Sequence, residues 1–141
     1  MIYHILAVGD VVGEPGLTHL ERSLRPLKKL KGIHFTVVNG ENAAGVGILP
    51  DQVDRLYQAG ADVVTLGNHT FGKGQILRRL EEDPYLLRPA NYTGRAPGRG
   101  YGVYDCGHIQ IAVMSLIGRC GRDVNADHPF TCLLYPSPSP P

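Results

Sequence analysis

The sequence has little of what marks membrane proteins, disulfide-rich secreted proteins or nucleic-acid-binding proteins. It contains no apolar run long enough to span a bilayer, so we expect no membrane partner. Its three cysteines are odd in number and form no C-x-x-C pair, which argues against a disulfide framework or a zinc ribbon and favours a reducing cytoplasm. The formal net charge is only +1, so we expect no strong binding to nucleic acid.

The two ends of the chain carry further expectations. No charged segment followed by an apolar one precedes the first expected strand, which begins at Ile2, so we expect no signal peptide. From Tyr135 onward the chain is rich in proline and serine, a composition that builds neither a helix nor an inner strand. The 141 residues, 43% of them hydrophobic, therefore indicate one folded domain over residues 1–130. Residues 131–141 would be a low-complexity tail that is disordered or non-native.

Three short apolar runs each end in a turn that carries polar side chains. The runs cover residues 5–8, 35–38 and 63–66, and their composition is typical of buried parallel strands. The carboxyl ends of such strands lie at one edge of the sheet, where ligands bind. We therefore expect the side chains of the turns to lie close together, namely Asp10, Glu41, Asn42, Asn68 and His69. Carboxylate, amide and imidazole groups suit divalent Mn, Fe, Mg or Zn, so the pattern indicates a metal-dependent hydrolase.

Between these runs the apolar residues recur at helical spacing. A first helix is indicated by five leucines, Leu17, Leu20, Leu24, Leu27 and Leu30. We expect a kink or a break in this helix at Pro26. A second helix should begin at Pro50 or Asp51 and end near Gly60, and a third should cover residues 73–82.

A β-hairpin is expected towards the end of the domain. Two β-rich runs, residues 101–104 and 109–114, flank the turn residues 105–108, and we expect this hairpin to join the sheet. A further short strand is expected at residues 86–88. Strands that alternate with helices predict an α/β layered fold with the order β-α-β-α-β-α, followed by the hairpin.

Each polar turn also has an ordinary structural explanation when it is taken alone. Asp10 could cap the following helix, Asn39-Gly40 could be a tight turn, and His69 could be a structural histidine. The coincidence of three such turns favours the metal site, because polar groups beside a buried strand, such as Asn68, are costly without partners. Several arginines could hold a phosphate, or could equally stay in solvent or bind backbone carbonyls: Arg88, Arg95, Arg99 and Arg119.

Three longer segments surround the polar turns: residues 5–16 (ILAVGDVVGEPG), residues 38–45 (VNGENAAG) and residues 59–70 (AGADVVTLGNHT). In this order they resemble the opening, the second motif and the third motif of the YmdB-like metallophosphoesterases, a branch of the calcineurin-like superfamily. Residues 87–92 (LRPANY) and 97–100 (PGRG) are similar to later segments. The similarity is collinear from Met1 to about Phe130 and corresponds to the N-terminal portion of the family.

The resemblance implies a dinuclear metal centre of Fe or Mn, with Mg or Zn as alternatives. Asp10 would bind the first metal, Glu41 would bridge both, Asn42 would add to the first and Asn68 would bind the second. His69 would donate a proton to the leaving group. Two cations about 3.5–4 Å apart can share a hydroxide and clamp the phosphate oxygens during in-line attack.

The resemblance also implies what this chain would lack. The family completes its metal centre with three histidines from a second half, and no matching motif follows Phe130. We therefore expect a partial metallophosphoesterase domain over residues 1–130, half of a layered sandwich, in a truncated and inactive chain. The implied activity is hydrolysis of a small phosphodiester, with 2′,3′-cyclic nucleotides as the suggested substrates. A phosphomonoesterase such as a nucleotidase, or a non-catalytic metal- or nucleotide-binding remnant, stays open, as does a homo-oligomer of the full-length protein.

Overall fold

The computed structural model describes residues 1–120 and 125–135. Four parallel strands form its central sheet, in the order β1 (Ile5–Val8), β2 (Phe35–Asn39), β3 (Val63–Thr65) and β4 (Leu86–Leu87). The register pairs Val8 with Val38 and Asn39 with Thr65, so the carboxyl ends of the first three strands lie at one edge. The parallel arrangement expected from the apolar runs is confirmed.

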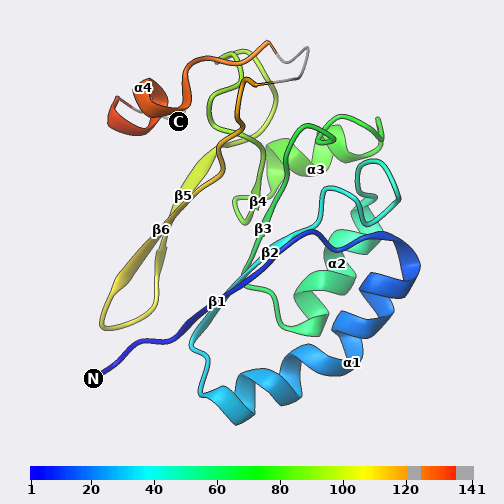
Figure 1. Ribbon diagram of the computed structural model, residues 1–141, viewed down its shortest axis with the longest axis vertical. Coiled ribbons are helices and arrows are strands. Elements are labelled where there is room, and N and C mark those ends of the chain that lie inside the picture. Colours follow the sequence, from blue (N-terminus) through cyan, green and yellow to red (C-terminus); the bar gives the residue numbers. More distant parts are fainter. Residues whose placement is uncertain (121–124, 136–141) are drawn as a thin grey trace.

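Three helices cover one face of this sheet. They are α1 (Gly13–Lys31), α2 (Pro50–Ala59) and α3 (Ile76–Glu82), and Figure 1 shows all three on the same side. Their apolar side chains and the inward residues of the strands form the larger core, with Leu17, Leu24, Leu56 and Ile76 fully buried. Burial of this kind is the main force that holds the layers together. The order of strands and helices agrees with the predicted α/β fold.

Helix α1 runs through Pro26 without a break, so of the two outcomes expected at this proline, a kink or a break, the break is wrong. Figure 1 shows the helix bend along its length, as a proline without an N–H group allows. Its end at Gly32 is fixed by a left-handed backbone with φ of 60°. Leu27 and Leu30, on the stretch after the proline, are exposed, so the leucine stripe is buried only before Pro26.

The hairpin lies on the opposite face of the sheet and forms a sheet of its own. Strands β5 (Tyr101–Asp105) and β6 (Gln110–Met114) pair antiparallel and do not extend the four-stranded sheet. The expectation that the hairpin joins that sheet is therefore wrong. The reason is packing: Tyr104 and Ile111 lie against Phe35, Val63 and Leu87 in a second core. The hairpin thus lies over β2, β3 and β4 on the sheet face that the helices leave open (Figure 1).

Two smaller expectations also need correction. The third helix begins at Ile76 and not at Lys73, because the glycines at 72 and 74 keep residues 70–75 in turns. Residues 131–134, expected in a disordered tail, lie in the short helix α4 (Pro129–Leu134). Residues 136–141 of that tail lie outside the described residues. No helix in the described ranges is both long and apolar enough to cross a membrane.

Candidate metal site at the carboxyl edge of the sheet

The three polar turns meet at the carboxyl edge of the sheet, as the sequence predicts. Asp10 follows β1, Glu41 and Asn42 follow β2, and Asn68 and His69 follow β3. Backbone bonds join the turns directly, since Val11 N donates to Asn39 O at 3.1 Å and Gly40 N donates to Thr65 O at 3.0 Å. The loops therefore hold each other in place before any ligand is bound.

Glu41 is the most enclosed acidic side chain of the group. Its carboxylate is 17% exposed and accepts the backbone N–H of His69 at Oε2 over 3.1 Å. The imidazole Nδ1 of His69 lies 3.9 Å from the same oxygen. A β-carbon at Gly67 would collide with both carboxylate oxygens of Glu41, so a larger residue there requires this side chain or the turn to shift. The turn Gly67-Asn68-His69 therefore packs directly against the Glu41 carboxylate.

Asn42 joins the first and third turns. Its Nδ2 donates to Asp10 Oδ1 at 2.8 Å, and its Oδ1 faces Nδ1 of His69 in a short hydrogen bond. Because the Asp10 carboxylate can only accept, it fixes the orientation of the amide, and Nδ1 of His69 must carry the proton of that bond. The free ring nitrogen of His69 is then Nε2. Backbone N–H of Gly13 also donates to Asn42 O, at 2.9 Å.

Asn68 lines a cavity of about 510 Å³ together with Glu41. This cavity lies between β2, β3, the end of β6 and the residues 115–118 that follow it. Asn39 also lines it. Its Nδ2 lies 3.5 Å from Glu41 Oε1, and its Oδ1 is buried without a hydrogen-bond partner among the described residues. A buried amide oxygen without a donor is costly, so Asn39 is an exception among the hydrogen-bonded polar groups of this edge.

The donor set suits part of a metal centre. Within residues 1–120 and 125–135, no three or more His, Cys, Asp and Glu side chains gather in a group that could hold a metal ion. The side chains that could offer oxygen ligands are of two kinds: the carboxylates of Asp10 and Glu41, and the amides of Asn42 and Asn68. Hard divalent cations accept such oxygens. The amide oxygen of Asn42 has two lone pairs, so its bond to His69 still leaves one for a cation.

Two residues near the site were missed as functional candidates by the sequence reasoning. Tyr92 donates its hydroxyl to Gly67 O at 3.3 Å, and burial raises the pKa of that hydroxyl, with the nearby charge of Glu41 adding to the rise. No local pattern links Tyr92 to Glu41, since only the folding of the segment after β4 brings the two together. Asn39 was considered only as part of a tight turn. Among the candidate phosphate-binding arginines, buried Arg88 instead binds the carbonyls of three residues, Pro89, Ala96 and Pro97.

Two solved structures share the layered α/β fold. The crystal structure of a hypothetical protein from Thermus thermophilus superposes with a TM-score of 0.82 at 31% identity, covering 92% of this chain and 50% of that one. A phosphatase from Mycoplasma pneumoniae superposes with a TM-score of 0.83 at 24% identity, covering 95% of this chain and 50% of that one, and shows likeness of fold.

The family follows from the sequence. The family model described as YmdB-like protein matches residues 6–135, and the chain belongs to this family, as its motifs predict. A Bacillus subtilis protein named 2′,3′-cyclic-nucleotide 2′-phosphodiesterase is 41% identical over 116 residues, which cover 82% of this chain and 44% of that protein. The chain therefore spans about half or less of the length of these relatives.

Proposed function

We propose that this chain supplies the carboxyl-edge ligands of a dinuclear metal site that hydrolyses small phosphodiesters, with 2′,3′-cyclic nucleotides as substrates. The observation that carries the proposal is the linked set Asp10–Asn42–His69–Glu41, which joins the turns after three parallel strands. The name of the Bacillus subtilis relative supports the substrate class. The matched residues cover 44% of that relative, so the proposal assigns this chain part of the centre.

The proposed ligands are the four oxygen-bearing side chains at the edge, Asp10, Glu41, Asn42 and Asn68. Glu41 is the proposed bridge between the two metals. It is the more enclosed of the two carboxylates, and its side chain reaches from the second turn to the backbone of the third. Fe or Mn are the proposed ions, with Mg or Zn as alternatives, because oxygen and amide donors suit all of them. When bound, a pair of such ions would activate a hydroxide and neutralise charge on the phosphate.

His69 is the proposed proton donor to the leaving oxygen. Its Nδ1–H is held by Asn42, so the proton for the leaving oxygen would come from Nε2 of the imidazolium form, which becomes the neutral ring. The contact orients the ring, because Asn42 is itself held by Asp10 at 2.8 Å. A histidine is well suited to the task, since its ordinary pKa lies near neutral pH.

A chimera tests the proposal with this chain's own residues. In it, the 116 residues that match the Bacillus subtilis phosphodiesterase replace the corresponding segment of that protein. We expect the chimera to hydrolyse 2′,3′-cyclic nucleotides and bis(p-nitrophenyl) phosphate, and to be much slower with p-nitrophenyl phosphate. A preference for the monoester would favour a phosphomonoesterase instead.

Single substitutions in the chimera separate the site from the scaffold. Glu41→Gln should abolish turnover with either substrate and lower metal content, whereas Glu81→Gln, an exposed carboxylate on α3, should change neither. A folded chimera that binds metal without any turnover would favour the non-catalytic remnant. Normal turnover in Glu41→Gln would show that Glu41 is not the bridge.

A further inference from the structure

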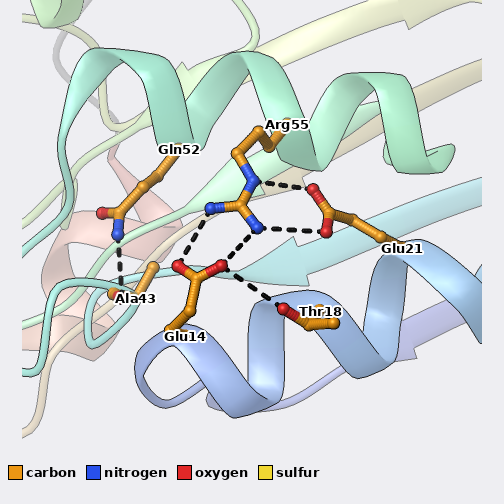
Figure 2. Close-up of polar contacts among 6 residues, drawn as sticks. All are labelled: Glu14, Thr18, Glu21, Ala43, Gln52 and Arg55. Atoms are coloured by element: carbon orange, nitrogen blue, oxygen red, sulfur yellow. Dashed lines mark hydrogen bonds and ion pairs between the residues drawn. The ribbon is translucent and has the colours of Figure 1, made fainter.

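Two side chains of α2 reach back to the segments that follow β1 and β2. Figure 2 shows Gln52 and Arg55, three positions apart and on one side of the helix, with Gln52 contacting a loop and Arg55 contacting a neighbouring helix. Gln52 contacts the loop after β2, and Arg55 contacts the first turns of α1. Neither residue touches the proposed ligands, so neither is part of the site described above.

Gln52 holds the loop one residue beyond Asn42. The side chain is buried, and its Nε2 donates to Ala43 O at 3.1 Å. Its Oε1 accepts the N–H of Leu49 at 3.0 Å, which caps the start of α2. One amide therefore ties both ends of the loop from Ala43 to Leu49 to the helix, and both of its polar atoms are used.

Arg55 holds the beginning of α1 through two carboxylates. Nη1 and Nη2 contact Glu14 at 2.9 and 2.6 Å, and Nε and Nη2 contact Glu21 at 2.7 and 3.0 Å (Figure 2). The bonds to Arg55 hold the pKa of both carboxyls below their usual range. Thr18 adds a hydroxyl bond to Glu14 at 3.3 Å. A planar guanidinium that engages two carboxylates fixes direction as well as distance.

We propose that Gln52 and Arg55 are positioning residues for the metal site, a role that rests on the proposed function. Asn42 must reach Asp10 on the α1 side and His69 on the β3 side at once. Arg55 sets where α1 begins, a few residues after Asp10, and Gln52 sets the loop that carries Asn42. A shift of about 1 Å between these two loops is enough to spoil a catalytic geometry.

The ordinary alternative is that these contacts only join two helices. Exposed ion pairs often add little stability, and a buried amide bond can serve packing alone. The two explanations differ in what a substitution changes. Loss of a purely structural contact lowers only the melting temperature. Loss of a positioning contact also alters the loop and its affinity for a cation under conditions where the protein stays folded.

The test measures Mn²⁺ affinity and hydrogen exchange on the chain itself. In Gln52→Glu, assayed well above the ordinary pKa of glutamate, the carboxylate keeps its acceptor for Leu49 N but repels Ala43 O. In Arg55→Met, Glu14 and Glu21 lose their shared cation. Arg78→Met is the matched control, because it removes an exposed ion pair between Arg78 and Glu82 on α3.

We expect Mn²⁺ binding to weaken about tenfold in Gln52→Glu and in Arg55→Met, the usual size for residues behind a metal ligand. Without metal, the amides of Ala43 and Gly45, which are bonded to Gly40 O and Asn42 O, should exchange faster in Gln52→Glu. Arg78→Met should change neither quantity.

Lower melting temperatures with unchanged affinity and unchanged loop exchange would overturn the inference. The two variants act on separate contacts, so a variant that fails to fold leaves the other to decide. Glu41→Gln is measured alongside them. If it binds Mn²⁺ as tightly as the unaltered chain, the proposed function fails, while the metal-free exchange rates of the loop still decide the positioning role.

Discussion

At the scale of single residues, Gly67 is where one added methyl group should disturb a proposed metal ligand most directly. Its β-carbon would collide with the Glu41 carboxylate, so Gly67→Ala must displace that side chain or the turn. We expect Mn²⁺ affinity to fall by at least about tenfold, because the displaced group is a proposed ligand. Gly74→Ala is the control, since nothing lies within 4 Å of its β-carbon. Equal affinity in both variants, measured by calorimetric titration, would argue against a ligand role for Glu41.

His69 allows proton donation to be separated from packing. In the chimera, His69→Ala should leave metal content almost unchanged and lower kcat by about 10²–10⁴-fold for a cyclic nucleotide, whose leaving group needs a proton. The loss should be smaller for bis(p-nitrophenyl) phosphate, whose leaving group needs none. His108→Ala, in the turn between β5 and β6, serves as the control. Equal losses with both substrates would mean that His69 only packs the loop.

The sequence could place these residues because the pattern that marks them is local. A buried strand followed by a polar turn positions Asp10, Glu41 and His69 at one edge without any knowledge of side-chain contacts. What it could not give is the chain of contacts through Asn42, or the nearness of Tyr92, because both depend on the angle between loops far apart in sequence. Their roles toward a metal stay predictions.

At the scale of elements, Tyr104 ties the hairpin to the four-stranded sheet. Its buried hydroxyl donates to Pro84 O at 2.8 Å, and burial raises its pKa to about 12. The unfolded chain loses this proton near pH 10, so the folded state holds the proton longer. The stability that the hydroxyl contributes is therefore complete below pH 10 and is lost as the pH rises from about 10 to about 12.

Denaturant unfolding of Tyr104→Phe at several pH values tests whether this hydroxyl causes the loss of stability at alkaline pH. The variant should lose about 1 kcal/mol at neutral pH, the net value of one hydrogen bond, and its stability should fall less steeply between pH 10 and 12. Tyr101→Phe, in the same hairpin, should keep the slope of the unaltered chain. A slope unchanged by Tyr104→Phe would mean that other groups cause the alkaline loss.

Helices and strands were predictable where one sequence feature decided the structure, and less so where two features favoured different outcomes. Leucine spacing predicted α1, and proline chemistry predicted a kink or a break at Pro26, where the helix in fact continues. The hairpin was recognisable from its turn, yet its sheet was not, since pairing partners depend on which face Tyr104 and Ile111 bury. The short helix α4 was missed because the tail was judged by its proline content.

At the scale of the whole molecule, one part of the sheet stays uncovered. The hairpin covers β2, β3 and β4, while Leu6 and Val8 of the edge strand β1 face the helices. Ile5, which alternates with them, is 53% exposed, and Val103 on β5 is 58% exposed. Apolar surface of this kind favours association.

We therefore expect the chain to associate with rising concentration in analytical ultracentrifugation. Ile5→Ser should weaken the association, whereas Leu30→Ser, an exposed leucine at the far end of α1, should not. A chain that stays monomeric at all concentrations and melts cooperatively would show that the exposed apolar surface around Ile5 does not cause association.

The central claim is that the turns after β1, β2 and β3 form one cation site, and Mn²⁺ titration of the chain tests it most directly. We predict saturable binding, followed by calorimetry or by electron paramagnetic resonance of free Mn²⁺. It should weaken at least about tenfold in Glu41→Gln and in Asp10→Asn, the order expected when a metal site is disturbed, and stay unchanged in Glu81→Gln. No saturable binding, or equal binding by all four proteins, would contradict the account.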